Sequence, residues 1–462
     1  MHMLDSQTLQ DRLSRAERYI NWVLHDLNLP GLAVGIVQNG SIIFLKGFGK
    51  ARPDRNVTDE TPFVIGSLSK SFTAVALLQL REAGKINLDA PVQSYLPWFR
   101  VSDDLYASVQ ITTRHLLTHT SGLSRFAGRE LLGQTKNVGR EQRVRELKNS
   151  RLVHPVGTVS EYSNCNYLVA GLLIEAVSGT FYENYLYEHI LRPLNMRYHT
   201  FLSEQSALYE GMATGYRWWF GLPVPAHVPF IRDALPAAFI VSSVHDMVRW
   251  LLFHLSEGTV DAVSLLSPEG MKELHRPQVA ADAHSTYALG WRVEQIEDEF
   301  ILRHGGETAN FLSEMVVIPG QQLGVVVLMN CNNVAVARMC NIRIATGLAR
   351  LLLELEPPRS KLSLRMFYTL VDSLVLVLTG IQLLSFIKLV RRTHSNVPLW
   401  RKRLATMVDL LLPLVYLWRL PRIKQVDSPW SLLYWYAPDI TNWILGMSIV
   451  SFTKAFFRWL RR

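Results

Sequence analysis

Cysteine is scarce in this sequence of 462 residues, and no metal-binding motif accompanies it. The cysteines are Cys165, Cys331 and Cys340; at least one of them must be unpaired, and none has the spacing of a metal ligand. A disulfide framework is therefore not expected. His115 and His119 stand four residues apart, a spacing that can bind zinc, but no third ligand accompanies them. We expect neither a metal site nor a cofactor.

The whole chain has a net charge of +9, but most of the sequence lacks an excess of positive charge. Residues 359–462 contain 16 Lys and Arg against 4 Asp and Glu, whereas the preceding residues contain 32 against 35. A nucleic-acid-binding domain would carry a basic patch on its own folded surface. Since the basic residues belong to the tail, nucleic acid is excluded as a partner.

The hydrophobic pattern indicates strands at both ends of the first 350 residues. A helical repeat at 7–27 precedes strand patterns at 32–37 and 42–48, which flank the turn residues Asn39 and Gly40. Strand patterns return at 300–303, 311–318 and 323–330, and a helical pattern follows at 335–354. Residues 67 to about 290 read mainly as helices and loops. The sequence predicts an α+β fold, with one antiparallel sheet made from both ends of the domain, flanking helices and a large helical insertion.

Pro357 and Pro358 mark a break between this domain and a different kind of sequence. Beyond them lie three apolar stretches, at about 367–390, 404–420 and 432–457, each close to the ~17–25 residues that span a bilayer. Aromatic residues cluster near their ends, as they do at membrane interfaces. We therefore expect a catalytic domain at 1–356 and a membrane domain with three transmembrane helices at 357–462, which makes the lipid bilayer a partner.

Ser67 and Lys70 are the strongest chemical signal in the sequence. They stand three residues apart at a predicted helix start, so that they share one face of the helix. A serine hydroxyl becomes a good nucleophile when an adjacent base takes its proton, and a lysine with a lowered pKa can act as that base. The helix start adds backbone N–H groups that favour developing negative charge. This spacing is typical of a serine acyl-transfer site.

Two further short motifs follow Ser67 in a fixed order. Tyr162 and Asn164 stand directly before a helical run, and the tripeptide of His304, Gly305 and Gly306 ends a predicted strand. Together with ITTRHLLTHTSGL at 111–123, PLNM at 193–196 and YALGW at 287–291, they make the sequence resemble the penicillin-recognising serine hydrolases. This family includes penicillin-binding proteins, class C β-lactamases, D-amino-acid peptidases and related esterases. The resemblance covers about residues 10–350.

The resemblance implies catalytic roles for four residues. Ser67 would be the acylated nucleophile, and Lys70 its proton acceptor together with Tyr162. Tyr162 would activate water for deacylation and return a proton to the leaving group, provided that Lys70 stabilises its phenolate. Asn164 would orient Lys70 and contact the substrate amide.

Residues around the third motif would bind the substrate. The backbone N–H groups of Ser67 and Glu307 would form the oxyanion hole, with Gly305 and Gly306 allowing the strand to approach closely. Asn310 and the Glu307 side chain are candidates for contacting a polar substrate group. His304 occupies the place of the lysine in the Lys-Thr-Gly motif of many relatives, and a neutral imidazole is a poorer anchor for a β-lactam carboxylate.

An aromatic segment at 216–220 and the residues at 237–239 are open to two interpretations. They either line a pocket near the nucleophile or belong to the core.

The sequence thus predicts a membrane-anchored serine hydrolase that acts on an amide or ester: a peptide, a D-amino-acid peptide or an acylated small molecule. Three alternatives remain. They are a non-catalytic penicillin-binding-type sensor of cell-wall fragments, a β-lactamase proper, and a regulatory partner of a transporter.

The resemblance extends to membrane-tethered bacterial members of the family, which implies a bacterial cell membrane. Basic residues are found at 391–392, 401–403 and 458–462, and such residues favour the cytoplasmic side of a membrane. With three membrane-spanning helices, this orientation predicts that the catalytic domain lies outside the cytoplasm. The beginning of the sequence, MHMLD, argues against this orientation, because no secretory signal peptide is visible there. Asp372, Asp409 and Asp439 lie in or near the apolar stretches, where charge is costly; they are either functional or interfacial.

Overall fold

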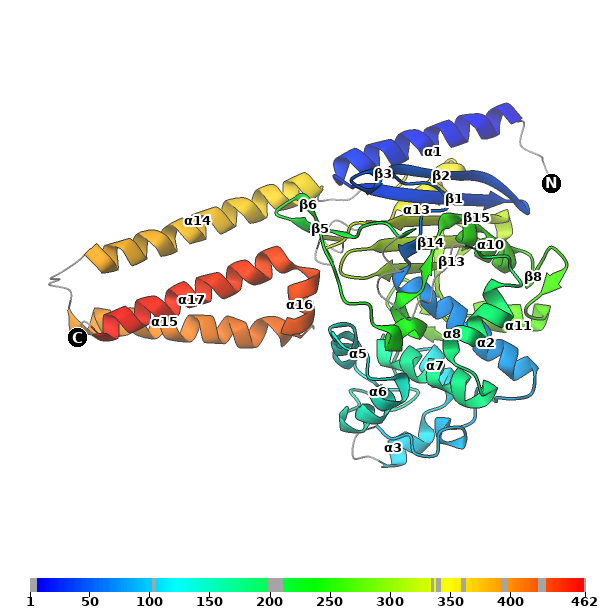
Figure 1. Cartoon of the computed structure of the whole chain (residues 1–462), viewed down its shortest axis with the longest axis horizontal. Helices are drawn as coiled ribbons and strands as arrows, with labels where there is room; N and C mark the ends of the chain where they lie inside the picture. The colour runs from blue at the N-terminus through cyan, green and yellow to red at the C-terminus, as the bar shows by residue number, and fades with distance from the viewer. Residues whose placement is uncertain are drawn as a thin grey trace.

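A nine-stranded antiparallel sheet forms the centre of the fold (Figure 1). The computed structural model describes residues 6–101, 105–197, 211–333, 336–337, 342–358, 363–391, 398–422 and 429–460. The strand order is β10-β11-β12-β13-β14-β15-β1-β2-β3, so the first strand pairs with the last. The strands are β1 Gly31–Gln38, β2 Ser41–Arg52, β3 Arg55–Asn56, β10 Val279–Ala280, β11 Thr286–Tyr287, β12 Arg292–Ile296, β13 Glu299–Glu307, β14 Leu312–Ile318 and β15 Leu323–Met329. The predicted α+β fold with a sheet from both ends of the domain is confirmed.

Alternating side chains along the strands divide the core into two layers. On β1, Leu32 and Val34 point to one face of the sheet, which α1 (Ser6–Asp26) and α13 (Ile344–Leu352) cover. Ala33 and Val37 point to the opposite face, which α10 (Val244–Leu255) covers. This period of two is what a strand buried on both faces requires. The predicted helix at 335–354 is only partly confirmed, because residues 334–335 and 338–341 lie outside the described residues.

The segment between the two halves of the sheet is mainly helical, as predicted. It also contains short strand pairs, β4 with β7, β5 with β6 and β8 with β9, which the hydrophobic pattern did not reveal. Their bounds are β4 Phe63–Val64, β7 Val241–Ser242, β5 Tyr216–Trp219, β6 Leu222–Pro225, β8 Thr259–Val260 and β9 Val263–Ser264. The helices are α2 Ser69–Glu82, α3 Leu105–Gln110, α4 Thr113–Leu117, α5 Arg125–Leu132, α6 Arg140–Glu146, α7 Asn164–Ser178, α8 Tyr182–Leu186 and α11 Pro268–His275.

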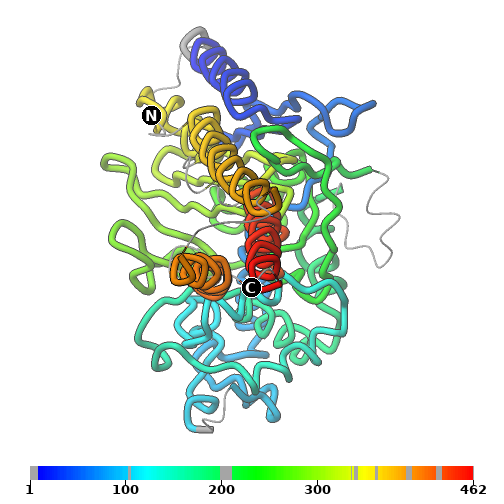
Figure 2. The backbone as a smooth tube through the Cα atoms, turned by 90° about the vertical axis from the view of Figure 1, so that its left-hand side faces the viewer, coloured from blue at the N-terminus to red at the C-terminus, as the bar shows by residue number. Residues whose placement is uncertain are grey.

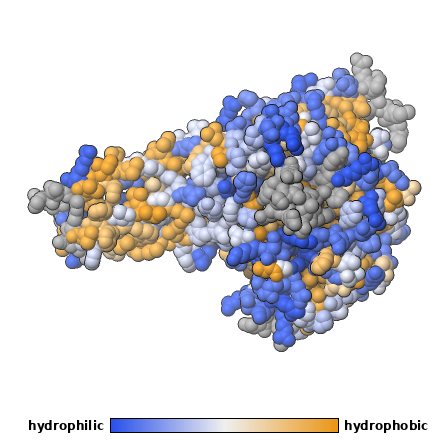
Figure 3. All heavy atoms as spheres, viewed as in Figure 1, coloured by the Kyte–Doolittle hydropathy of each residue, from blue (hydrophilic) through white to orange (hydrophobic). Residues whose placement is uncertain are grey.

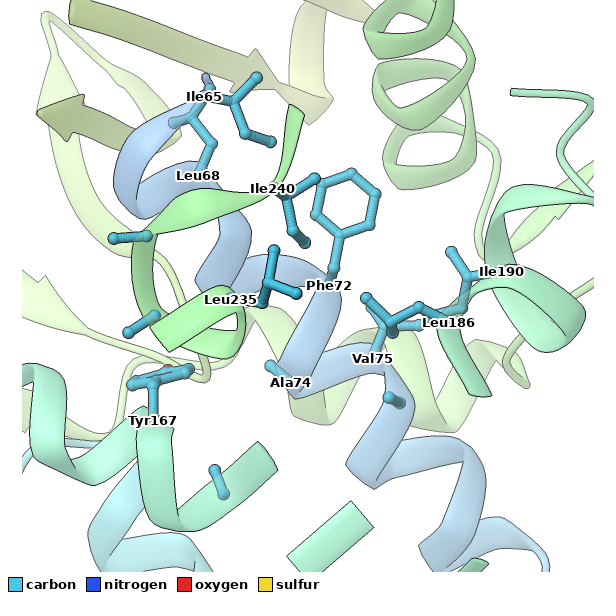
Figure 4. Packing of buried hydrophobic residues seen from close by; sticks show 14 of the residues in the cluster. Ile65, Leu68, Phe72, Ala74, Val75, Tyr167, Leu186, Ile190, Leu235 and Ile240 are labelled. Carbon is cyan, nitrogen blue, oxygen red and sulfur yellow. The ribbon is translucent and has the colours of Figure 1, made fainter. Parts of the chain in front are cut away.

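Helix α2 runs through the middle of this core (Figure 4). Phe72 and Val75 project from it toward Leu235 and Ile240 on one side and the α8 region on the other. The Phe72 ring stacks on Trp250 with 3.9 Å between ring centroids. Burying one such side chain contributes about 1.5–3 kcal/mol. The dense packing fixes α2, and therefore the residues at its first turn.

Three long helices project from the part of the molecule that contains the sheet (Figures 1 and 2). They are α14 Leu364–Arg391, α15 Leu399–Arg419 and α17 Pro438–Leu460, and each is long and apolar enough to cross a membrane. Their outer surface is apolar, in contrast to the hydrophilic surface of the sheet-containing part (Figure 3). The third predicted span, 432–457, is divided into α16 (Trp430–Tyr436) and α17. The reason is Pro438, which lacks an N–H donor and disfavours helical geometry at Ala437, where φ is −145°.

Charged side chains tie the projecting helices together. Asp409 of α15 accepts from Arg458 of α17 and lies 3.1 Å from the Lys454 ammonium. Lys454 also donates to Gln382 of α14 at 2.7 Å. Asp409 is therefore a packing residue between helices, since an unpaired carboxylate inside an apolar bundle would be costly.

Candidate active site

Ser67 lies in the short 3-10 turn that leads into α2, with Lys70 one turn later. The Lys70 Nζ is 3.0 Å from the Ser67 Oγ. Gly66 adopts a φ of +55°, and a Cβ at this position would collide with the backbone of Gly306 and Glu307. Glycine is therefore required at residue 66, both for the backbone turn and for the close approach of β13. This geometry puts the serine next to the edge of the sheet.

Lys70 is fully buried, and its hydrogen-bond partners are the Ser67 hydroxyl, the Asn164 amide oxygen and the Ala237 carbonyl. Its Nζ donates to the Asn164 Oδ1 at 2.8 Å and to the Ala237 carbonyl at 2.7 Å. Burial lowers the pKa of Lys70 well below its usual value. A neutral amine has two hydrogens for these two oxygens and a lone pair for the Ser67 hydroxyl. The site can therefore hold a lysine base in its unprotonated form.

Tyr162, two residues before the start of α7, completes the group of side chains around Ser67. It is hydrogen-bonded to Ser67, and the Lys70 ammonium position lies 4.8 Å from its ring centroid. Burial raises the pKa of Tyr162 to about 12, although the hydrogen bond with Ser67 opposes the shift. The phenol is therefore protonated at neutral pH. His119 packs beside it, with 4.3 Å between ring centroids.

His119 and His115 have packing and hydrogen-bonding partners in the structure. The His119 Nδ1 accepts from the Ser163 backbone N–H at 3.2 Å, while His115 belongs to the capping box of α4 with Thr112. Within the part of the chain that the structure describes, no group of three or more His, Cys, Asp or Glu side chains is arranged to hold a metal ion.

The edge of β13 forms the opposite side of the site. β12 pairs with β13 only at residues 299–303, so that residues 304–307 continue beyond this neighbour. The other edge of these residues pairs with β14. The backbone of Gly306 and Glu307 contacts Gly66, which brings the Glu307 N–H near Ser67. A substrate carbonyl next to Ser67 would therefore meet the part of β13 that extends beyond β12.

His304 is buried at this edge and has two defined partners. Its Nε2 lies 3.0 Å from the Tyr287 hydroxyl, and its Nδ1 lies 2.8 Å from the Gly305 carbonyl. Because a carbonyl can only accept, Nδ1 carries the hydrogen and Nε2 accepts from the tyrosine. Burial lowers the pKa of His304 to about 3, so the imidazole is neutral at neutral pH.

A cavity of about 240 Å³ connects these groups. Ser67, Tyr162, Asn164, His304, Gly305 and Glu307 line it, and Lys70 and Gly306 contact its lining residues from behind. The structure therefore brings together all but one of the predicted site residues.

Asn310 is the exception. Its Nδ2 donates to the Ala226 carbonyl at 2.9 Å, and its side chain lines a separate, smaller cavity beside Phe311. The prediction that Asn310 contacts the substrate does not fit this position, because the side chain faces a cavity that Ser67 does not line. The aromatic segment 216–220 also lies outside the site: Trp218 is fully buried and donates to the Leu27 carbonyl.

Six residues that line the cavity were not predicted from the sequence. Arg125, Arg129 and Leu132 lie on α5, Arg292 begins β12, and Arg303 lies on β13. The i, i+4 spacing of Arg125 and Arg129 is a weak signal, because it is equally typical of a solvated helix face. The sixth residue, Tyr436, comes from α16. Nothing in the local sequence reveals it, because its place depends on how the projecting helices dock.

The family model for β-lactamase matches residues 16–349. The protein flp of Staphylococcus aureus is 31% identical over 320 residues, which cover 68% of this chain and 63% of that protein. The unguisins hydrolase ungD' of Aspergillus campestris is 30% identical over 66% of this chain and 59% of its own length. The chain thus spans less than two thirds of these relatives.

Solved structures show the same fold. The octameric penicillin-binding protein homologue from Pyrococcus abyssi has a TM-score of 0.66 and 26% identity, and the match covers 75% of this chain and 78% of that chain. A class C β-lactamase has a TM-score of 0.63 and 22% identity, covering 78% and 99%. The chain therefore belongs to the β-lactamase family of serine hydrolases, with a β-lactamase/transpeptidase-like fold.

Proposed function

We propose that this protein is a membrane-anchored serine hydrolase that forms an acyl-enzyme at Ser67 and acts on an amide or ester. The observation that carries the proposal is the buried Lys70 amine, whose Nζ lies 3.0 Å from the Ser67 Oγ and donates to the oxygens of Asn164 and Ala237. This arrangement directs the lone pair of the amine at the hydroxyl. It supplies a base within hydrogen-bond distance of the serine nucleophile.

Acylation follows from these positions. The Ser67 Oγ attacks the substrate carbonyl as its proton moves to Lys70, and the carbonyl oxygen accepts hydrogen bonds from the backbone N–H groups of Ser67 and Glu307. The proton then passes from the Lys70 ammonium through the Tyr162 hydroxyl to the leaving amine or alcohol as the bond to it breaks. Tyr162 acts as a proton relay in this scheme, because its raised pKa keeps the phenol protonated.

Deacylation reverses these roles. Water adds to the acyl carbonyl while its proton moves through Tyr162 to Lys70, and the same proton returns to the Ser67 oxygen when the acid leaves. One water is consumed and no cofactor is needed. The substrate would be a peptide, a D-amino-acid peptide or an acylated small molecule.

We further propose that the catalytic part lies outside the cytoplasm of a bacterial cell. Arg391, Arg401, Lys402, Arg403 and Arg458 all lie at the end of the bundle that is remote from the catalytic part (Figure 1). Such basic ends favour the cytoplasmic side of a membrane. Fusion of a reporter that is active only in the cytoplasm to the C-terminus tests this orientation; loss of reporter activity would contradict it.

A fluorophosphonate label tests the nucleophile. The full chain in detergent should incorporate the label at Ser67, and Ser67→Ala should abolish the incorporation. Ser94→Ala, at an exposed serine far from the cavity, is the matched control and should label normally. A label retained in Ser67→Ala would overturn the proposal.

The sensor alternative makes a different prediction for the same preparation. A sensor would form a stable adduct with a fluorescent penicillin and release no product from esters or amides. Repeated turnover of a p-nitrophenyl ester that depends on Ser67 would exclude this alternative, whereas a single stoichiometric burst would favour it.

A further inference from the structure

One wall of the catalytic cavity is formed by the group of helices that projects from the catalytic part. Tyr436, the last residue of α16, lines the same cavity as Ser67 and Tyr162. Helix α16 lies at the end of the bundle that faces the catalytic part, where it packs against α5 (Figure 1). Leu432 of α16 is fully buried, and a Cβ on Gly133, just after α5, would lie 3.0 Å from the Ser431 Oγ. The contact between α16 and α5 is therefore close-packed.

A basic side chain of the catalytic part holds α16 near its C-terminal end. The Arg217 guanidinium of β5 donates to the carbonyls of Tyr434 and Trp435 at 3.5 and 3.3 Å. It also lies 5.7 Å from the Trp435 ring centroid. These carbonyls belong to the last turn of a helix, where oxygen atoms lack helical partners and favour a cation.

A buried carboxylate holds the chain immediately after α16. Asp439 is 1% exposed, and its Oδ2 accepts from the Phe220 backbone N–H and the Tyr368 hydroxyl, both at 3.2 Å. Its Oδ1 accepts from the Asn333 Nδ2 at 3.4 Å. The hairpin β5–β6, the segment after β15 and helix α14 thus meet at one side chain. Arg217 and Asp439 together fix where Tyr436 lies.

The wall has a distinct chemical character. Among the described residues that line the cavity, Leu132 of α5 and Tyr436 of α16 offer apolar surface apart from the catalytic Tyr162. The cationic residues of the lining are Arg125, Arg129, Arg292 and Arg303. Leu132 and Tyr436 come from the two helices that pack against each other. Their position defines a place for an apolar group next to the nucleophile.

We propose that α16 is part of the substrate site: Tyr436 and Leu132 bind the apolar part of the substrate, and Arg217 and Asp439 are positioning residues that hold Tyr436 there. The inference rests on the proposed hydrolase function and assigns the specificity of that site. The projecting helices are then a component of the catalytic centre as well as an anchor.

A chain-length series of p-nitrophenyl esters tests Tyr436 in the full-length protein in detergent. The ratio of kcat/KM for octanoate to that for acetate should fall at least about tenfold in Tyr436→Ala, mainly through KM, because an apolar contact at the acyl chain is lost. Tyr436→Phe keeps the ring and should keep the ratio. Tyr434→Ala, on the same helix but with an exposed side chain, is the matched control. An unchanged ratio in Tyr436→Ala overturns the inference.

Asp439→Asn tests the positioning role. The amide offers an N–H₂ group where Asp439 accepts hydrogen bonds, so Tyr436 should shift and the octanoate preference should fall while fluorophosphonate labelling of Ser67 persists. Asp372→Asn removes the same charge from α14 and should leave the ratio unchanged. A preserved preference in Asp439→Asn would remove Asp439 from the proposal. Absence of labelling in the unaltered protein would instead contradict the hydrolase function itself.

Discussion

The carbonyl of Ala237 accepts a hydrogen bond from the Lys70 amine at 2.7 Å, although 167 residues separate them. Ala237 lies in a π-helical turn, Leu235–Phe239, that packs against α2 and α7. Such single turns frequently occur at functional sites. Here the turn supplies an oxygen that fixes the amine without adding a negative charge, which would have raised the pKa of Lys70.

Lys70→Met should strongly slow acylation while keeping the shape of the site. Loss of the base is expected to slow fluorophosphonate labelling of Ser67 by about 10²–10⁴-fold. In the unaltered protein the labelling rate should rise with pH and level off well below pH 10, because burial lowers the pKa of Lys70 and the neutral amine is the active form. Labelling rates between pH 5 and 10 measure this. A rise centred at the ordinary lysine pKa would contradict the assignment.

Gly66→Ala should prevent labelling and destabilise the protein. The new Cβ would collide with β13 and would require a φ of +55°, which non-glycine residues rarely adopt. Gly84→Ala is the matched control, because Gly84 has a φ of +69° but open space around it. The control should lose only about 1 kcal/mol of stability and should keep its labelling rate. Equal effects of the two substitutions would show that contact with β13 is unimportant.

His304→Lys should increase acylation by a fluorescent penicillin relative to a neutral ester. An ammonium binds the penicillin carboxylate better than the neutral imidazole does, and a charge-assisted hydrogen bond corresponds to about tenfold or more in rate. Second-order labelling rates with penicillin and ester turnover measure the change. His304→Gln keeps a neutral side chain and serves as the control. A parallel change with both reagents would exclude carboxylate recognition at residue 304.

Acid should destabilise the catalytic part through a buried and a half-buried histidine outside the site. The His254 Nδ1 lies 2.9 Å from the His275 Nε2, and burial lowers the pKa of His275 to about 3 and that of His254 as well. The unfolded chain binds protons near pH 6.5, whereas the native pair does not. The stabilisation is therefore complete above pH 6.5 and is lost as the pH falls toward 3, by up to about 1.4 kcal/mol per pH unit for each group.

Denaturant unfolding at several pH values, followed by tryptophan fluorescence, measures this dependence. The Trp250 and Trp291 rings pack on His254 at 4.8 and 4.7 Å and report the loss of this packing. His275→Gln should flatten the dependence, while His284→Gln, at an exposed residue, should not. An unchanged slope in His275→Gln would rule out the pair as its source.

Local patterns predicted most of what the structure shows. The i, i+3 spacing of Ser67 and Lys70 encodes their contact within one helical turn, and the turn at Asn39 and Gly40 encodes the first hairpin. Short, nearly continuous apolar runs predicted the central strands of the sheet, because a strand that is buried on both faces has apolar side chains at almost every position. These features depend on residues that are close together in the sequence, so they can be predicted from local patterns.

Features that depend on distant packing were not predictable. Tyr436 reaches the cavity only because α16 docks on α5, and the break at Pro438 looked like the interior of one long apolar stretch. Asn310 stands close to the third motif in sequence, but the chain turns it into a separate cavity. In each case the position is set by tertiary contacts that leave no local pattern.

The location of Tyr436 also has a bearing on the order of synthesis. A ribosome makes Ser67, Lys70 and Tyr162 long before it makes α16, and N-terminal parts of a chain generally fold first. The nucleophile and its base can therefore be assembled while the cavity is still open on one side. The cavity gains its remaining wall only when α16 has emerged and docked on α5, so that the substrate site matures later than the nucleophile and its base.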